Sequence, residues 1–384
     1  MDNKFELDLT LLSKELKLLL ELLKEENEEN IQRNKKELFS GIDWGQFLYL
    51  VKHHRVYPLM YVKLKHMDES IVPKEVIETL YQEYKRNTFQ MLQLSAEMKR
   101  VSNLFMGNGI HLLFLKGPVI AHDIYGDISL RTSKDLDILI EEKNLKKAEE
   151  LLFSLGYKKE GVQTILNERK WRGYHILYYH SKTGMQIEIH WRMQPFPMKE
   201  QSFNELWRLK RTSSLMGSPI YFLREEDLFV YLVSHGARHG WFRLRWLKDL
   251  DKMLRKEISF EEIYVLLKRY KYYFAGGQVL ILASELLQTP VNGKMQGIMK
   301  EKRSGRLANM AYLHMRDGKS ILPSRNYLRL LKTTSQKILS IALLFYPTFV
   351  DTRIVKLPKP LYFLYFAFRP FLWTWRKTKK LISS

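Results

Sequence analysis

Two aspartates, Asp135 and Asp137, stand two residues apart in a short apolar run. The alternation from Asp135 to Ile140 predicts a β-strand, on which these two side chains share one face with Cα atoms about 7 Å apart. Carboxylates held side by side repel each other and raise each other's pKa. A divalent cation removes this repulsion, and Mg2+ prefers one or two carboxylates together with phosphate oxygens. Two such ions can hold the attacking and leaving oxygens of a phosphoryl or nucleotidyl transfer.

A third carboxylate, Glu188, lies in a second predicted strand from Gln186 to Trp191, where it shares a face with His190. If this strand neighbours the first one in the same sheet, Glu188 lies beside the aspartate pair. We therefore predict that Asp135, Asp137 and Glu188 are both the catalytic residues and the ligands of Mg2+ (or Mn2+).

A phosphate-binding turn is predicted at Lys116 and Gly117, between an apolar strand and a helix. Glycine allows a phosphate to approach the backbone closely, and a helix N-terminus presents free N–H groups. Lys116 adds a point charge for a phosphate. Arg131 and Ser133, just before the aspartates, add a guanidinium and a hydroxyl to the predicted nucleotide-binding residues.

An isolated Asp-x-Asp pair is a weak signal, since most such pairs are strand ends that face water. More specific is the order of the segments. A strand is followed by Lys-Gly, a helix, Arg-x-Ser-x-Asp-x-Asp, another helix and a hairpin with an apolar-Glu-apolar strand. This order favours the metal-site interpretation.

The predicted strands lie between two helical regions. One long helix is expected to begin with Pro73 in its first turn and to end near Met106. Asn144 can cap a helix that Gly156 closes. The turn at residues 181–184 predicts a hairpin. The strands are expected at residues 111–115, 135–140, 174–179 and 186–191.

This pattern predicts an α+β fold in which a small sheet is embedded between helical N- and C-terminal regions. We expect the active-site cleft between the sheet and the C-terminal helices. The predicted boundaries are a helical N-terminal region (1–107), an α/β core (108–215), a helical C-terminal domain (216–340) and a basic aromatic tail (341–384).

The quoted motifs resemble those of the bacterial family called uncharacterised nucleotidyltransferases, which belongs to the DNA polymerase β-like superfamily. The Lys-Gly and Arg-x-Ser-x-Asp-x-Asp pattern is also similar to that of type IV toxin nucleotidyltransferases of the abortive-infection kind. The resemblance is strong from about residue 44 to 250. It rests on Leu113–Ala121, Tyr125–Asp127, Leu130–Ile140, Leu155–Tyr157, Ile187–Trp191 and Ser234–Asp249.

This resemblance implies a mixed sheet of the polymerase β type and transfer of a nucleoside monophosphate from an NTP, with release of pyrophosphate. The carboxylate triad of the superfamily corresponds to Asp135, Asp137 and Glu188. Its glycine-serine turn corresponds to Lys116 and Gly117, where the serine is absent. The acceptor is not implied, so tRNA, a protein and a small molecule all stay open.

Two histidines, His235 and His239, are four apart on a predicted helix and share a face. A zinc site would need a third ligand or the glutamate of an H-E-x-x-H motif, and neither is in view. Packing against the sheet or donation to a phosphate is the favoured interpretation. Arg243 and Arg245 can line an acceptor groove or form a structural helix face. The candidate acceptor or phosphate contacts are His190, His235, His239 and Arg243.

The last segment, Lys356–Ser384, contains seven basic residues and no acidic one, interleaved with aromatic residues. Three interpretations stay open: aromatics packed on the helical domain, an amphipathic segment on an anionic membrane surface, and a single-stranded RNA contact. Pro370 is expected to break any single long helix there.

The composition sets the remaining limits. The 384 residues carry a net charge of +21, which attracts polyanions such as nucleic acids, nucleotides and anionic lipids. The chain has no cysteine, which excludes disulfides, thiolate zinc sites and cysteine nucleophiles. No signal-peptide pattern or apolar run of about 18 residues is present. We expect a cytoplasmic protein, with peripheral membrane attachment through the tail as an alternative.

Two rival functions remain at this stage. The first is a non-catalytic NTP sensor on the same fold, and the presence of all three carboxylates argues against it. The second is an accessory protein that binds RNA or a membrane surface through its tail.

Overall fold

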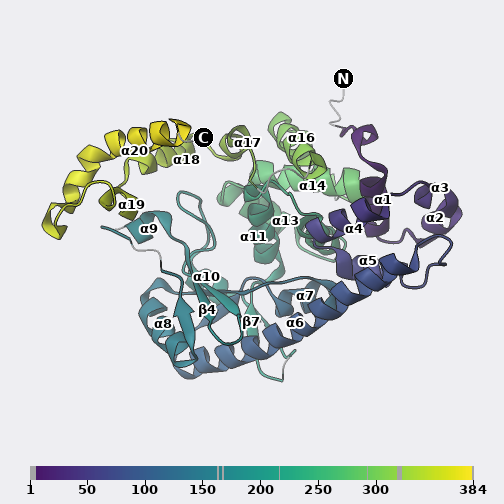
Figure 1. Ribbon diagram of the computed structural model, residues 1–384, viewed down its shortest axis with the longest axis horizontal. Helices are drawn as coiled ribbons and strands as arrows, with labels where there is room; N and C mark the ends of the chain where they lie inside the picture. The colour runs from purple at the N-terminus through teal and green to yellow at the C-terminus, as the bar shows by residue number, and fades with distance from the viewer. Residues whose placement is uncertain are drawn as a thin grey trace.

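The structure, a computed structural model, describes residues 6–382 apart from 162–163, 167, 216, 292 and 318–321. A seven-stranded mixed sheet lies among helices that precede and follow it in the chain (Figure 1). The expected α+β class is therefore confirmed.

The strand order is β3-β4-β5-β2-β1-β7-β6. The central strand β2 pairs antiparallel with β1 and parallel with β5, while β1 pairs parallel with β7. β7 lies beyond the boundary expected at residue 215, so the sheet extends further along the chain than the predicted strands. The strands are β1 (Leu112–Phe114), β2 (Leu136–Ile140), β3 (Tyr157–Lys159), β4 (His175–His180), β5 (Gln186–His190), β6 (Arg211–Ser213) and β7 (Ile220–Phe222).

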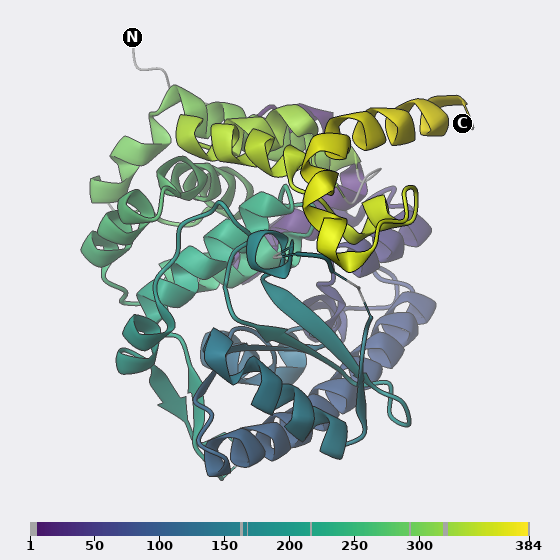
Figure 2. The same ribbon diagram turned by 90° about the vertical axis from the view of Figure 1, so that its left-hand side faces the viewer.

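The helices before and within the sheet region include the 34-residue α6, which begins after Pro73, as expected. Its buried side chains recur at helical spacing, and the helix packs against β1, α7 and α8. Figures 1 and 2 show this long helix running past the sheet. These elements are η1 (Leu9–Leu11), α1 (Lys14–Leu23), α2 (Glu28–Arg33), α3 (Lys35–Phe39), α4 (Trp44–His53), α5 (Tyr57–Leu64), α6 (Lys74–Gly107), α7 (Pro118–Tyr125), η2 (Ile128–Leu130), η3 (Glu142–Asn144), α8 (Leu145–Ser154), α9 (Glu168–Arg172) and α10 (Phe203–Arg208).

The helices that follow the sheet pack back onto the N-terminal region, and one hydrophobic core runs from Leu7 to Tyr327. They are α11 (Glu225–Arg238), α12 (Leu244–Leu254), α13 (Phe260–Arg269), α14 (Tyr273–Leu287), α15 (Gly293–Met299), α16 (Lys302–Asp317), α17 (Arg325–Leu331), α18 (Thr334–Ala342), η4 (Leu343–Phe345), α19 (Phe349–Thr352), η5 (Lys359–Leu364) and α20 (Tyr365–Ile382).

A buried histidine joins the two helical regions. His54 follows α4 and is fully buried. Its Nδ1 accepts a hydrogen bond from the amide of Leu244 (3.3 Å), and its carbonyl accepts one from the amide of Arg245 (3.3 Å). The start of α12 is thereby fixed against the N-terminal helices.

Protonation of His54 is expected to destabilise the fold. Burial lowers the pKa of His54 from 6.5 to about 3. Because the folded pKa is the lower one, the stabilisation is present above the unfolded pKa and is lost as the pH falls toward the folded pKa. His54 alone should lower the free energy of unfolding by about 2 kcal/mol between about pH 7 and about pH 5. Denaturant unfolding at the two pH values should show that His54→Asn loses less free energy of unfolding than the wild type does. An equal loss in both proteins would contradict the assignment of this pH dependence to His54.

The C-terminal segment ends in α20, which continues through Pro370. The predicted helix break was therefore wrong. Proline removes one backbone hydrogen bond from a helix, but Arg369, the residue before it, is fixed by a buried ion pair with Asp351 (2.7 Å). Among the described residues, none of the helices combines the length and apolar character that crossing a bilayer requires.

Candidate active site

The three predicted carboxylates meet at β2 and β5. These strands are parallel neighbours, and Asp137 and Glu188 are direct partners in their register. β2 begins at Leu136, so Asp135 lies just before the strand rather than within it. Leu136 and Ile138 are fully buried in the core, and the alternation of the strand places the carboxylate of Asp137 on the opposite face.

Asp137 is 1% exposed and sits between two nitrogen donors. Its Oδ1 lies 2.9 Å from Nζ of Lys116 and 3.2 Å from Nε2 of His190. Burial by itself would raise the pKa of Asp137, but Lys116 and His190 hold that pKa well below its usual range. Asp137 is therefore a charged carboxylate inside the protein.

The pKa of Asp135 is shifted in the opposite direction. Burial, followed by the neighbouring charge of Asp137, raises the pKa of Asp135 to about 6. The positive charge of Lys116 opposes this rise. The two aspartates thus show the mutual repulsion expected from their spacing, and a cation bound between them would relieve it.

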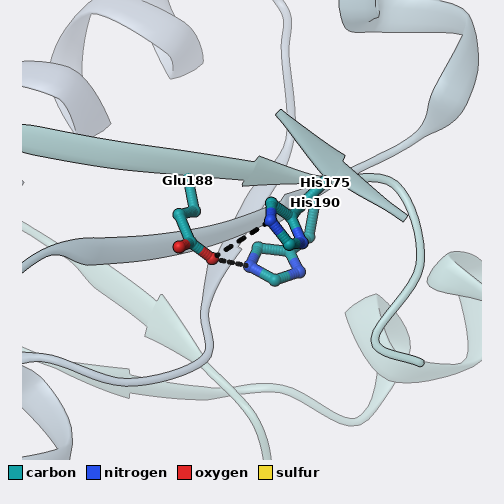
Figure 3. A group of neighbouring side chains, drawn as sticks. All are labelled: His175, Glu188 and His190. Carbon is teal, nitrogen blue, oxygen red and sulfur yellow. Dashed lines mark ion pairs between the residues drawn. The ribbon is translucent and has the colours of Figure 1, made fainter. Parts of the chain in front are cut away.

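Glu188 belongs to a second group of potential ligands, with His175 and His190 (Figure 3). Its Oε2 lies 3.3 Å from Nε2 of His190 and 3.9 Å from Nε2 of His175. One ligand atom from each residue falls within a 4.8 Å span, a spacing that can hold a metal ion. Imidazole donors suit zinc, copper, iron and nickel ions, whereas carboxylates suit Mg2+ and Mn2+.

The two histidines differ in their charge preference. Burial would lower the pKa of His190, but its bonds to Asp137 and Glu188 raise it. For His175, burial and the neighbouring His190 lower the pKa. Through its Nε2, His190 therefore links the carboxylates of the two adjacent strands.

His175 was missed from the sequence although a signal was present. The turn predicted at residues 181–184 joins two strands and therefore fixes which of their residues pair in the hairpin. Extending that register from the turn pairs residue 175 with residue 190, and the structure shows this pairing. Applying the register would have added His175 to the candidate residues.

The Lys-Gly turn adopts a backbone that favours glycine. Gly117 has φ +98° and ψ −158° at the N-cap of α7, and a Cβ there would meet Cδ2 of Leu136 at 3.3 Å. The turn places Lys116 against Asp137, as its ion pair shows.

Replacing Gly117 with alanine should therefore cost stability. The strained backbone predicts a loss of about 1–3 kcal/mol in the free energy of unfolding, together with weaker NTP binding. Gly107→Ala is the matched control, because Gly107 is helical, has no neighbour within 4 Å of an added Cβ and should be neutral or slightly stabilised. Chemical denaturation compares them, and equal effects at both positions would refute the argument.

Arg131 and Ser133 make contacts inside the protein. The guanidinium of Arg131, which is 1% exposed, donates to both carboxylate oxygens of Asp249 at 3.0–3.2 Å. The hydroxyl of Ser133 donates to the carbonyl of Asp135 (3.1 Å). The predicted phosphate contact of Arg131 is not supported by this placement, because the side chain is directed to α12. Both residues instead fix the chain that leads to Asp135.

His235 and His239 form an aromatic cluster with Trp246. Their rings lie 4.8 Å apart, and each lies 5.3 Å from the Trp246 ring. Burial lowers the pKa of His239 to about 4 and that of His235 well below 6.5. Both rings are therefore neutral, and the packing partner seen here is Trp246 of α12 rather than the sheet.

Two arginines, Arg55 and Arg245, bring positive charge to Asp135, and Arg243 lies near Arg55. Arg55 follows α4, whereas Arg243 and Arg245 stand at the start of α12. Burial and Arg55 lower the pKa of Arg243 to about 10, and burial followed by Arg131 lowers that of Arg245 to about 9. Arg55 and Arg245 each interact electrostatically with Asp135. Such a group of cations is suited to an anionic ligand.

Two residues that surround the aspartates were not predicted from the sequence. Arg55 comes from the N-terminal helices, and Tyr231 of α11 is buried and interacts electrostatically with Lys116 and Asp137. Both are distant from the aspartates in sequence and have no local motif. Only the packing of the helices around the sheet brings them to the site.

A cavity of about 380 Å3 opens beside His175. Its walls combine charged side chains with aromatic ones. His175 lines this cavity and also belongs to the group of potential metal ligands with Glu188 and His190. The lining includes Lys159, Glu160, Glu168, Arg172, Tyr174 and Trp191.

Comparison with known proteins places the chain in a family. The model of the uncharacterised nucleotidyltransferase family matches residues 40–288. No protein of curated function matches the chain. Among solved structures, a solution structure of the antibiotic-resistance factor ANT(2'')-Ia aligns with a TM-score of 0.35 and 12% identity over 49% of this chain and 95% of that one.

Two further solved structures align at a similar level. A crystal structure of ANT(2'')-Ia with adenylyl-2''-tobramycin gives a TM-score of 0.35 and 10% identity over 48% of this chain and 99% of that one. An antigenic nucleotidyltransferase-like protein from Paracoccidioides brasiliensis gives 0.31 and 12% over 53% of this chain and 94% of that one.

The family match spans well over half of the chain and includes Asp135, Asp137 and Glu188. The class to which the sequence motifs pointed is thus the nucleotidyltransferases. The chain belongs to the uncharacterised nucleotidyltransferase family.

Proposed function

We propose that the protein transfers a nucleoside monophosphate from an NTP to a hydroxyl group of an acceptor. The observation that carries this proposal is the register of β2 and β5, which makes Asp137 and Glu188 direct neighbours, with Lys116 at 2.9 Å from Asp137. In the reaction, the acceptor oxygen forms a bond to the α-phosphorus. The bond from that phosphorus to the β-phosphate oxygen breaks, and pyrophosphate leaves.

Asp135, Asp137 and Glu188 are the residues that would hold Mg2+ (or Mn2+). The donor set fits such an ion because Oδ2 of Asp137 is buried without a hydrogen-bond partner among the described residues. In addition, burial and the neighbouring charge of Asp137 raise the pKa of Asp135. A bound divalent ion would supply neutralisation of the charge that develops on the phosphate oxygens.

The triphosphate is assigned to the positive side of the site. Lys116 and the backbone at Gly117 lie at the N-terminus of α7. Arg55 and Arg245 interact with Asp135, and Arg243 lies near Arg55. Arg243 and Arg245 each have a buried Nε with no hydrogen-bond partner among the described residues. These guanidinium groups can donate to phosphate oxygens and limit the access of water.

Glu188 is the better candidate to accept the proton of the acceptor hydroxyl. Its side chain is 24% exposed, against 2% for Asp137, and His190 holds its Oε2 at 3.3 Å. The cavity beside His175 is the proposed acceptor site, since it adjoins Glu188 through that residue. Whether the acceptor is a tRNA, a protein or a small molecule is left to experiment.

A labelling experiment tests the proposed reaction. The protein is incubated with Mg2+ and each α-32P-labelled NTP, together with tRNA, total protein or a small-molecule extract from the host. Label that appears in one fraction with the wild type, and not with Asp135→Asn/Asp137→Asn, would identify the nucleotide and the acceptor class. Mg2+-dependent NTP binding without a product in any fraction would favour the rival function, an NTP sensor.

A further inference from the structure

The exposed apolar surface of the protein is concentrated in its C-terminal segment. About half of the exposed large hydrophobic side chains of the described residues lie between Ile338 and Trp375, a segment of about a tenth of the chain. Folded proteins rarely leave contiguous apolar surface uncovered unless it binds something. Figure 1 shows α20 along one edge of the molecule, away from α11–α16.

The side of helix α20 that faces the protein includes two arginines. Tyr365, Arg369 and Leu372 are buried, and Arg376 is half-buried, a spacing of four, three and four residues that defines one helix face. On this face Arg369 and Arg376 both pair with the fully buried carboxylate of Asp351, at 2.7 and 3.2 Å. The hydroxyl of Tyr365 donates to the carbonyl of Val355 (2.5 Å). These contacts fix the rotation of the helix.

The aromatic residues consequently point outward. A water-soluble surface helix normally buries its apolar residues and exposes its charged ones, whereas α20 buries Arg369 beside Tyr365 and Leu372 and leaves other aromatic residues exposed. Phe371 is 75% exposed and Trp375 is 56% exposed. On α20, Phe368, Phe371 and Trp375 share one exposed side of the helix, called here the aromatic face, and Phe366 and Trp373 are exposed on another side.

The charge around this face has one sign. After residue 317 the only acidic residue of the chain is Asp351, and its carboxylate is neutralised inside the protein by the two arginines. Arg353, Lys356 and Lys359 are exposed. The charged residues next to the aromatic face that come from this segment are therefore basic.

We propose that the aromatic face docks onto an anionic phospholipid surface. Phenylalanine and tryptophan partition into the headgroup region of a bilayer, and lysine or arginine beside them is attracted to anionic lipids. A second copy of the chain would place basic surface against basic surface. Stacking of nucleic acid bases would not account for the exposed aliphatic residues Leu344 and Val350 nearby.

Docking would bring the candidate acceptor cavity close to the membrane. The segment preceding α20 is bound to α9: the guanidinium of Arg172 donates to the carbonyls of Leu343 and Tyr346, and the carboxylate of Glu168 accepts a bond from the amide of Phe349 (2.9 Å). Arg172 and Glu168 also line the cavity. The membrane proposal itself rests on the aromatic face and does not depend on the proposed reaction.

Vesicle cosedimentation of the full-length protein tests the proposal. The vesicles are phosphatidylcholine alone and phosphatidylcholine with phosphatidylglycerol. The wild type should bind the anionic vesicles, less so at high salt, and Phe371→Ser/Trp375→Ser should lower the partition coefficient about tenfold or more. Lys356→Glu/Lys359→Glu should weaken binding and reduce its salt dependence. Phe89→Ser/Leu92→Ser, which changes two exposed residues of α6, is the matched control and should bind as the wild type does.

Quenching of tryptophan fluorescence by brominated lipids provides a second measurement on the unaltered protein, with insertion of the aromatic face expected to give quenching. Three results would overturn the proposal: no binding of the wild type to anionic vesicles, unchanged binding by a folded Phe371→Ser/Trp375→Ser variant, or a self-association or single-stranded RNA complex that this variant abolishes while vesicle binding is absent.

Discussion

Asp137→Asn should reduce the rate of nucleotidyl transfer roughly a thousandfold, on the order of 4 kcal/mol in transition-state stabilisation. The substitution keeps the size of the side chain but removes the charge that Lys116 and His190 hold at 2.9 and 3.2 Å. An amide binds a divalent cation far more weakly than a carboxylate does. Lys116 then also loses its ionic partner.

The rate is measured as incorporation of label from an α-32P-labelled NTP into the acceptor fraction. Glu97→Gln is the matched control. Glu97 is also buried (5% exposed), but it accepts hydrogen bonds from Arg100 and Tyr157, which are not among the candidate site residues. The folded part of the Glu97→Gln protein should transfer nucleotide at the wild-type rate. Circular dichroism of each variant separates a loss of chemistry from a loss of fold. A folded Asp137→Asn protein with the wild-type rate would remove Asp137 from the mechanism.

Asp249→Asn should produce the largest loss of stability, about 3–5 kcal/mol in the free energy of unfolding. The carboxylate of Asp249 and the guanidinium of Arg131 are both fully buried and lie 3.0 Å apart. The hydroxyl of Tyr125 donates to the same carboxylate at 2.9 Å. Loss of the negative charge leaves a buried arginine without its partner, and a buried unpaired charge is costly.

A double variant separates the charge effect from the effect of packing. Arg131→Met/Asp249→Leu replaces the pair with apolar side chains and should recover much of the loss. Asp317→Asn is the exposed control, since the ion pair of Asp317 with Arg316 lies at the surface and should contribute less than about 1 kcal/mol. Urea denaturation measures all four proteins. A loss at position 249 no larger than at position 317 would contradict a structural role for the buried pair.

The central strands could be predicted because each carries its signal locally. The alternation of residues 135–140 and of 186–191 is a period-two pattern that few other structures produce, and it places Asp137 and Glu188 where they are found. Pro73 marked the start of α6 for a similar reason, since proline is favoured at a helix N-terminus.

The remaining features depend on contacts that are distant in sequence. β6 and β7 have three residues each, too few for a periodic signal, and β7 is a strand because it pairs with β1. Arg131 stands next to the aspartates in sequence, but the residue that it bonds to is Asp249, which is 118 positions away. Its assignment to the triphosphate followed from local order alone.

The tail shows the same limit. A proline inside a helix normally ends or kinks it, and no nearby residue in the sequence signals otherwise for Pro370. The buried pair of Arg369 with Asp351 provides the compensation, and that pair exists only once α19 and α20 have packed together. A charge run next to aromatics could likewise not reveal which side of α20 faces the protein.

The most direct test of the account is to measure pyrophosphate release by the wild type and by Glu188→Gln, with Mg2+, the NTP and the acceptor fraction that takes up label. The account predicts release by the wild type in proportion to the label transferred, and a loss of about a hundredfold or more in the variant, whose NTP binding persists. Equal release by the two proteins, or label transfer without pyrophosphate, would contradict a nucleotidyl transfer centred on Asp135, Asp137 and Glu188.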